Sequence, residues 1–123
     1  MNFIIVKPQL SKEELIELII KEFPPTKEDI LDEIYEGLIH LQVGVLADYT
    51  NQCIQKSRFD EVSRIFQFFD AVIDKVDSET DNAFYVSFLE HIDMDDGSNK
   101  QNEAIKLLPK KYLEAYKGLR NFS

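Results

Sequence analysis

Apolar residues recur at intervals of three and four along most of this sequence, and that spacing constrains the fold more than any other feature. In residues 59–76 the apolar positions step by 3, 3, 1, 3, 3, 1 and 3: Phe59, Val62, Ile65, Phe66, Phe69, Val72, Ile73 and Val76. A period near 3.6 residues predicts an amphipathic α-helix. No segment of the sequence shows the sustained alternation of a strand. The pattern therefore predicts an all-α fold.

Start and stop signals define a first helix near the N-terminus. Ser11, followed by Glu14 three residues later, is a capping-box pattern that begins a helix. Pro24-Pro25 ends it, because proline removes a backbone donor and disfavours helix in the residue before it. Residues 1–10, which precede this helix, are expected to form an extended N-terminal segment.

The stretch from residue 27 to residue 56 admits two interpretations. Thr26 and Asp29 repeat the start signal, and apolar residues then recur with helical spacing: Ile30, Leu31, Ile34, Leu38, Leu41, Val45 and others up to Ile54. The stretch is either one helix or two helices that break near Glu36-Gly37. A single helix, rising about 1.5 Å per residue, would exceed a domain of this size. We therefore favour the break, with Gly44 at a close contact between helices.

Shorter helices are predicted in the C-terminal part of the chain. Apolar spacing indicates helices over 83–92 and 104–108, with a turn over 95–99, and Pro109 suits the first position of a last helix. Six or seven helices joined by short connectors must pack as neighbours. Residues 1–123 are therefore expected to form one all-α domain, either an irregular multi-helix bundle or a short α–α superhelix.

The net charge is −9 and is unevenly distributed. Residues 1–97 hold 21 acidic and 8 basic residues, whereas residues 98–123 hold 2 acidic and 6 basic residues. A negative field repels nucleic-acid phosphates and anionic lipid head groups and attracts basic proteins. Neither a basic leader nor an apolar run of bilayer length occurs in the sequence. We expect a cytoplasmic protein that binds neither nucleic acid nor membrane directly.

Few residues are suited to catalysis or metal binding. Cys53 is expected to be a small buried thiol, and His40 and His91 have no metal-ligand spacing with it. Residues 93–99 are rich in oxygen ligands, but placing Gly97 at the sixth position of an EF-hand loop puts apolar residues at ligand positions. We expect no catalytic residue, no metal and no cofactor, and hence a binding protein rather than an enzyme.

Two acidic sets with nearby tyrosines are the predicted partner-binding residues. The first set would line one edge of a helix through its i, i+4 spacing, and it consists of Glu28, Asp29, Asp32, Glu33 and Glu36, with Tyr35. The second set closes the 59–76 helix, where carboxylates oppose the helix dipole, and it includes Asp70, Asp74 and Asp77, with Tyr85. Each set is either an ordinary solvated face or a docking surface whose tyrosines are aromatic anchors.

Three segments carry a resemblance to a known family. They are the segment HLQVGVLADY at 40–49, the segment FYVSFLEH at 84–91, and Leu107-Leu-Pro109 followed by Tyr112 and Tyr116. Over about residues 35–120 the chain resembles an uncharacterised family of small bacterial all-α proteins. Small acidic members of such families are similar to the immunity proteins of polymorphic toxin systems, including contact-dependent growth inhibition.

The resemblance implies an immunity protein whose partner is a cognate toxin. The charge suggests a basic nuclease domain, because a nuclease is basic where it holds phosphate and an acidic surface can occupy that groove. The alternative is a helical adaptor or scaffold that binds a peptide or a regulatory partner. Both remain hypotheses at this point.

Overall fold

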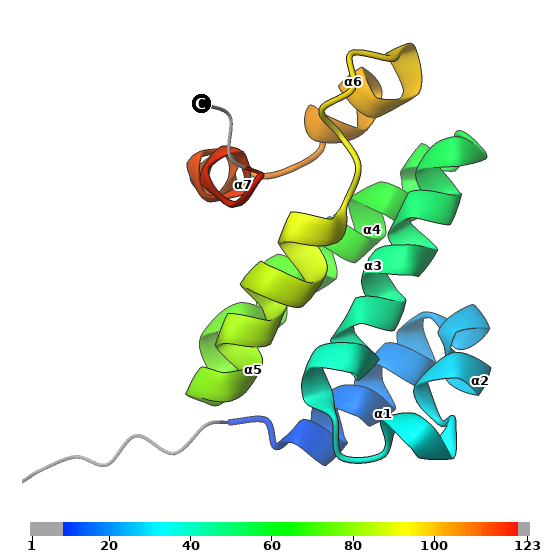
Figure 1. Cartoon of the computed structure of the whole chain (residues 1–123), viewed down its shortest axis with the longest axis vertical. Helices are drawn as coiled ribbons and strands as arrows, with labels where there is room; N and C mark the ends of the chain where they lie inside the picture. The colour runs from blue at the N-terminus through cyan, green and yellow to red at the C-terminus, as the bar shows by residue number, and fades with distance from the viewer. Residues whose placement is uncertain (1–8, 121–123) are drawn as a thin grey trace, which may run out of the picture.

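A computed structural model describes residues 9–120, and within that range the fold is all-α, with seven packed α-helices and no strand (Figure 1). The predicted extended segment falls almost wholly on residues 1–8, outside the described residues. The α-helices are α1 (Lys12–Glu22), α2 (Lys27–Ile30), α3 (Ile39–Gln55), α4 (Phe59–Val72), α5 (Ser78–Ala83), α6 (Asn99–Ile105) and α7 (Leu113–Leu119). Single turns lie between them: η1 (Pro24–Thr26), η2 (Glu33–Tyr35), η3 (Ile73–Lys75), η4 (Phe84–Phe88), η5 (Leu89–His91) and η6 (Lys110–Tyr112).

The predicted capping box at the start of α1 is confirmed. The Ser11 hydroxyl accepts from the Glu14 backbone N–H at 3.1 Å, and the Ser11 N–H donates to the Glu14 carboxylate at 3.0 Å. Two orphan donors of the first turn are thereby satisfied. The helix ends at Glu22, and Pro24 then occupies the first position of η1, so the proline pair acts as the predicted stop.

The predicted break between residues 27 and 56 is also confirmed. Helix α2 ends at Ile30, and α3 begins only at Ile39. Between them Gly37 has a φ of +73°, a left-handed conformation that glycine adopts without the strain a side chain would cause. The chain therefore turns sharply just before α3 and exposes the residues on either side of the turn.

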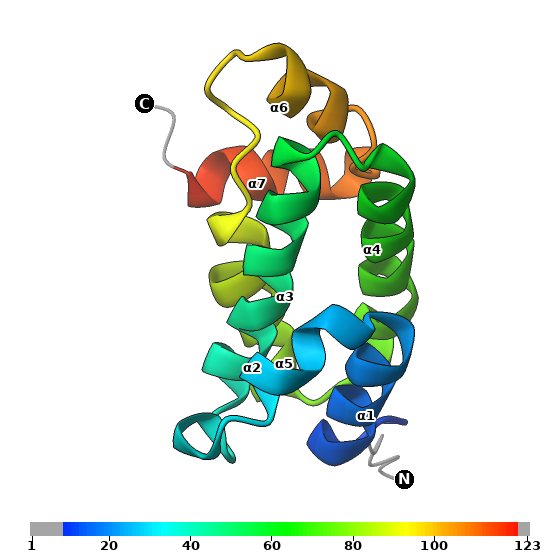
Figure 2. The same ribbon diagram turned by 90° about the vertical axis from the view of Figure 1, so that its right-hand side faces the viewer.

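The core lies where α3 and α4 run side by side and the segment from α5 to η5 packs against α3 (Figure 2). Phe69 is fully buried at its centre, with its ring centroid 5.3 Å from that of Phe88 and 4.5 Å from that of Tyr112. Both ring pairs are tilted, and close aromatic pairs add to the stabilisation from burial alone. The amphipathic helix predicted over 59–76 is confirmed as α4 continued by η3.

Two helix boundaries in the second half were predicted too late along the chain. The helix predicted over 83–92 begins at Ser78, because the Asp77 carboxylate caps α5 by accepting from the Thr80 N–H at 2.7 Å. It continues through a π-helical turn, η4, into η5. The helix predicted over 104–108 begins at Asn99, where Ser98 is the cap, so the predicted turn ends one residue earlier. Pro109 precedes η6, a turn of 3-10 helix that leads into α7.

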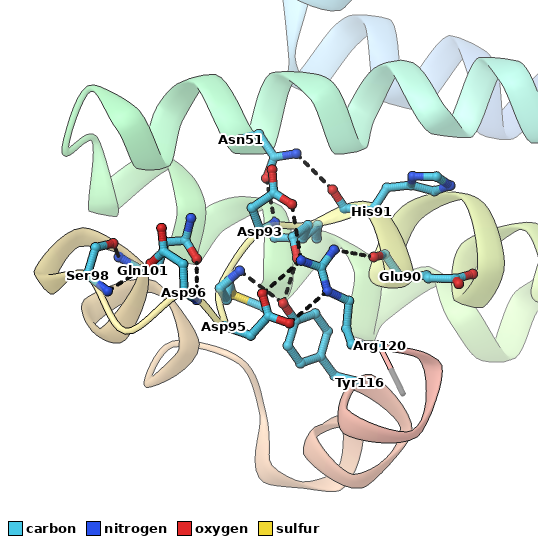
Figure 3. A network of polar contacts seen from close by, with 12 residues as sticks. Asn51, Glu90, His91, Asp93, Asp95, Asp96, Ser98, Gln101, Tyr116 and Arg120 are labelled. Atoms are coloured by element: carbon cyan, nitrogen blue, oxygen red, sulfur yellow. Dashed lines mark hydrogen bonds and ion pairs between the residues drawn. The ribbon is translucent and has the colours of Figure 1, made fainter. Parts of the chain in front are cut away.

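The C-terminal helix is attached to the rest of the fold by a polar network around Arg120 (Figure 3). The Arg120 guanidinium bonds to the carboxylates of Asp95 at 2.8 Å and Asp93 at 3.2 Å, and to the carbonyl of Glu90 at 2.8 Å. The buried Tyr116 hydroxyl donates to the Ile92 carbonyl at 2.7 Å, and burial raises the pKa of Tyr116 to about 12. Asp93 and Asp95, which suggested a calcium loop in the sequence, therefore bind an arginine of the same chain.

Candidate protein-docking surface

Four large apolar side chains are exposed within eleven residues of one another. The exposed fractions are 56% for Leu31, 69% for Ile34, 48% for Leu38 and 47% for Leu41, and among the described residues no other large apolar side chain is exposed to this degree. Single exposed leucines are common on protein surfaces, but a contiguous apolar group indicates an interaction site. The apolar spacing had placed these residues in a helical stretch, but Leu31, Ile34 and Leu38 lie outside the α-helices.

The local backbone explains why these side chains face outward. Ile30 and Ile39 are buried and fix the two ends of the connection between α2 and α3. Between them the Asp32 carboxylate accepts from the Ile34 N–H at 3.1 Å and starts η2, and Gly37 then reverses the chain. Because no continuous helix spans this stretch, its apolar residues do not share one inward-facing stripe.

The first acidic set lies in the same stretch of the chain as these apolar side chains. Glu28, Asp29, Asp32, Glu33 and Glu36 are all exposed, and within residues 9–120 none of them is in an ion pair. The sequence contains no lysine or arginine from residue 28 to residue 55. We call these residues together the acidic–apolar patch: Glu28, Asp29, Leu31, Asp32, Glu33, Ile34, Glu36, Leu38 and Leu41.

The predicted arrangement of the carboxylates on one helix edge is not found. Glu28 lies in α2, Asp32 precedes η2 and Glu36 follows it, so the three residues belong to different elements. The break near Gly37 was foreseen, but the earlier end of α2 at Ile30 was not. The five carboxylates are nevertheless all exposed and lie in one short segment, residues 28–36.

Open hollows flank the patch on two sides. Leu31 lines one hollow of about 420 Å³ together with Ile16, Gly37 and Gln42. Leu31 also lines a second hollow, of about 500 Å³, beside Pro24, Pro25 and Glu28. A surface that combines apolar side chains with adjacent concavities can receive side chains from a protein or peptide partner.

The second acidic set is largely engaged within the fold. Asp70 pairs with Lys111 at 2.8 Å and accepts from the Tyr112 hydroxyl, and these contacts hold the pKa of the Asp70 carboxyl below its ordinary value. Asp74 is exposed. Tyr85 is half-buried with its ring edge-on to Phe69, and burial raises the pKa of its phenol. Of this set, Asp70 and Tyr85 thus have structural contacts.

The predicted conflict between Asp77 and a helix dipole is not found in the structure. It does not close the preceding helix but caps α5, and its carboxylate also pairs with Lys12 at 2.7 Å. Burial by itself would raise the pKa of the Asp77 carboxyl, but the hydrogen bonds from Lys12 and Thr80 outweigh burial and lower it. A carboxylate at a helix N-terminus is favoured by the dipole, so the placement is locally stabilising.

The structure does not bring the two acidic sets together. In Figure 1 α2 lies on one side of the lower end of α3 and the start of α5 lies on the other, with α1 nearby. The two predicted tyrosines belong to different elements, Tyr35 to η2 and Tyr85 to η4, and Tyr85 packs on Phe69. Within the part of the chain that the structure describes, only the first set is accompanied by exposed large apolar side chains, so this set forms the candidate docking surface.

The histidines and the cysteine have structural surroundings. His40 is half-buried, and its Nδ1 lies 2.8 Å from the Ser87 hydroxyl, which links α3 to η4. Cys53 is buried as predicted, and burial raises the pKa of its thiol, which disfavours the reactive thiolate. No group of three or more potential metal ligands gathers among the described residues. Likewise, no helix among the described residues is both long enough and apolar enough to cross a bilayer.

Comparison with known proteins identifies a family but no activity. The sequence model described as a domain of unknown function, DUF7674, matches residues 16–123. No curated protein and no solved structure matches the chain. The resemblance to an uncharacterised family is thus confirmed at that level, and a toxin-related role is a matter for proposal.

Proposed function

Since the chain belongs to the DUF7674 family, whose description assigns no activity, we propose a function from the acidic–apolar patch. The protein is an immunity protein that binds a basic toxin, a nuclease domain, through this patch and neutralises it. The single observation that carries the proposal is a stretch of fourteen residues, from 28 to 41, with four exposed large apolar side chains and five exposed carboxylates, none of which is in an ion pair within residues 9–120.

The composition of the patch suits a protein partner better than a small molecule. Stable protein interfaces have an apolar centre and a polar rim, and a few central side chains supply most of the binding energy. Ile34 and Leu38 are the central candidates, because they are exposed and lie within one turn of Tyr35. An interface of standard size buries about 1,600 Å² in total, so the partner would extend beyond the patch.

The charge of the patch indicates a basic partner. Carboxylates without internal partners keep their field available at the surface, and such a field can raise association rates by about 10 to 1,000-fold. A nuclease is positive where it holds the phosphate backbone. Occupation of that groove by carboxylates would exclude the nucleic-acid substrate, which is the physical basis of neutralisation in this proposal.

The adaptor function is the second candidate, and the hollows beside Leu31 favour it. An amphipathic peptide could place alternate side chains into these hollows while its basic residues pair with the patch. The two functions differ in their consequence: the immunity function requires loss of a toxin's activity on binding, whereas the adaptor function requires binding alone.

The experiment measures binding to, and inhibition of, purified nuclease toxin domains encoded beside the gene for this chain. We expect one of these domains to bind with an affinity that falls as salt is raised, and to lose nuclease activity in the complex. Binding without inhibition would overturn the immunity function in favour of the adaptor. Failure of every such domain to bind would overturn the nuclease proposal.

Matched variants locate the contact on the protein. The test variant combines Glu28→Lys, Glu33→Lys and Glu36→Lys, and it omits Asp32 because that carboxylate caps η2. The control combines Asp60→Lys, Asp74→Lys and Glu114→Lys, which are exposed residues outside the patch and change the net charge equally. We expect association to slow at least about 10-fold more in the test variant than in the control. Equal slowing would mean that only net charge matters and would remove the patch from the site.

A further inference from the structure

Gly44 lies in the middle of α3, where neither the backbone nor the packing requires glycine. Its φ is not positive, and a Cβ built on it would lie 3.7 Å from the Ser87 carbonyl oxygen, which is ordinary van der Waals contact. Glycine is among the poorest residues for a helix interior because it loses the most backbone entropy. The prediction that Gly44 permits a close approach is therefore only partly right: η4 does lie beside it, but alanine would fit.

The space that a larger side chain at position 44 would enter is an open hollow of about 240 Å³. The hollow lies between α3, η2 and η4, and it is lined by Tyr35, His40, Leu41, Gly44, Val45, Asp48, Ser87 and His91. Leu41 also belongs to the acidic–apolar patch, so the hollow adjoins that patch. A residue that lowers helix stability without improving packing is explained if it keeps this hollow open.

The hollow is negatively charged and partly aromatic. Asp48 is exposed, and within the described part of the chain it is in no ion pair. Among the described residues, no lysine or arginine lines the hollow. Tyr35 is half-buried, and His40 is already bonded through Nδ1 to Ser87. A hollow lined by a carboxylate and by an aromatic ring is an environment that attracts a cation.

We propose that the hollow at Gly44 is an anchor pocket for an arginine side chain of the basic partner. The inference rests on the proposed function, because the hollow is continuous with the acidic–apolar patch. A guanidinium has a planar face that can stack on an aromatic ring such as that of Tyr35, and it has paired donors for a carboxylate such as that of Asp48. A lysine ammonium is a strongly hydrated point charge that offers no planar face for stacking, so the pocket prefers arginine.

A small probe tests the pocket without any toxin. The full chain, labelled with ¹⁵N, is titrated with N-acetyl-arginine methylamide and monitored by the amide shifts of Gly44, Asp48 and Ser87. N-acetyl-citrulline methylamide, which has a similar shape but no charge, is the ligand control. We expect the arginine probe to bind in the millimolar range, with shifts confined to the hollow, and the citrulline probe to bind at least about 10-fold more weakly, since the charge-assisted bond is lost. Equal shifts from both probes, or no shifts in the hollow, would overturn the pocket.

Variants separate the pocket from the patch. Asp48→Asn removes the charge from an exposed position, and we expect it to reduce arginine binding at least about 10-fold. Gly44→Phe fills the hollow and should abolish binding, with the helical circular dichroism signal showing that the chain still folds. Gly118→Ala, at an exposed glycine of α7 with no neighbour within 4 Å, is the silent control.

The arginine pocket and the proposed immunity function can be disproved independently of each other. If the arginine probe causes no amide shifts in the hollow, while the variant with lysine at Glu28, Glu33 and Glu36 binds the toxin more weakly than its control does, the pocket is wrong and the patch stands. If the probe binds as expected but no toxin binds, the pocket stands as an arginine site and the immunity function is wrong.

Discussion

Asp77 and Glu28 are both acidic residues near the start of a short helix, yet one is bonded within the fold and the other faces solvent. The Asp77 carboxylate caps α5 and pairs with Lys12 at 2.7 Å. Glu28 lies in the first turn of α2, and among the described residues it is in no ion pair. The same contrast separates the two acidic sets as wholes, apart from the exposed Asp74.

The difference lies in what surrounds each set. The 70–77 segment lies against Lys12 of α1 and Lys111 of η6, so cations from distant parts of the chain reach it. The carboxylates of the 28–36 segment are exposed and in no ion pair among the described residues, although Lys12 and Lys27 line the hollows beside Leu31. A carboxylate that is paired internally contributes to folding, whereas one left unpaired beside exposed leucines is available to a partner. Acidic clusters therefore have to be judged by their neighbours and not by their composition.

The largest expected effect on stability comes from removing the Asp77 carboxylate. Asp77→Ala removes the cap of α5 and the pair with Lys12, and we expect it to lower the free energy of unfolding by about 1–2 kcal/mol. The matched control is Asp74→Ala, an exposed acid of the same set, which should change it by less than about 0.5 kcal/mol. Urea unfolding at pH 7 measures both. Equal effects would show that the cap seen at Asp77 contributes nothing.

A smaller loss is expected at Asp70. Asp70→Ala breaks the hydrogen bond from the Tyr112 hydroxyl and the pair with Lys111, and we expect a loss of about 1 kcal/mol. A double-mutant cycle with Tyr112→Phe isolates the hydrogen bond, because the phenyl ring keeps its packing on Phe69. A coupling free energy indistinguishable from zero would contradict the assignment of this bond.

At acidic pH, the free energies of unfolding of the wild type and of a variant that lacks both paired carboxylates should become more similar. The pKa values of Asp70 and Asp77 are lower in the folded chain than their ordinary values, which are about 3.9 in an unfolded chain. Their contribution to stability is thus present above that value and is lost as pH falls through the folded-state pKa values. We expect the difference in the free energy of unfolding between the wild type and the double variant Asp70→Asn, Asp77→Asn to decrease when it is measured from pH 6 to pH 3. A difference that stays constant over this pH range would mean that the variant loses stability through altered packing and not through the missing charges.

The smallest effect is expected in the acidic–apolar patch. Combining Glu28→Gln, Glu33→Gln and Glu36→Gln should change the free energy of unfolding by less than about 0.5 kcal/mol, because exposed side chains without partners contribute little to folding. Thermal unfolding at low and high salt measures this change. A loss of more than about 1 kcal/mol would mean that these carboxylates support the fold, and the contrast with the 70–77 set would disappear.

Periodicity and capping signals in the sequence located most of the helices. The spacing of Phe59 to Val76 predicted α4, and the Ser11–Glu14 pattern predicted the start of α1 to the residue. The break before α3 followed from the length of the stretch and from Gly37. These features are local, since a helix's period and its caps depend on residues only a few positions apart.

The candidate site was predicted only in part. Its five carboxylates and Tyr35 were identified from the sequence, but Leu31, Ile34, Leu38 and Leu41 were interpreted only as part of a helical repeat and not as exposed binding residues. The available signal was the run from residue 28 to residue 55 without lysine or arginine, in which pairs of acidic and apolar residues alternate just before Gly37. Apolar spacing continues through this run, so spacing alone could not reveal that the helix stops.

By itself the sequence determined the all-α class, the helical period of the core and several helix ends, because each of these depends on interactions between near neighbours. Only the tertiary structure decided which carboxylates are neutralised, since Lys12 reaches Asp77 and Lys111 reaches Asp70 across long sequence separations. It also decided that four leucine and isoleucine side chains stay in solvent. Burial and ion pairing are properties of the packed chain, and a one-dimensional pattern does not contain them.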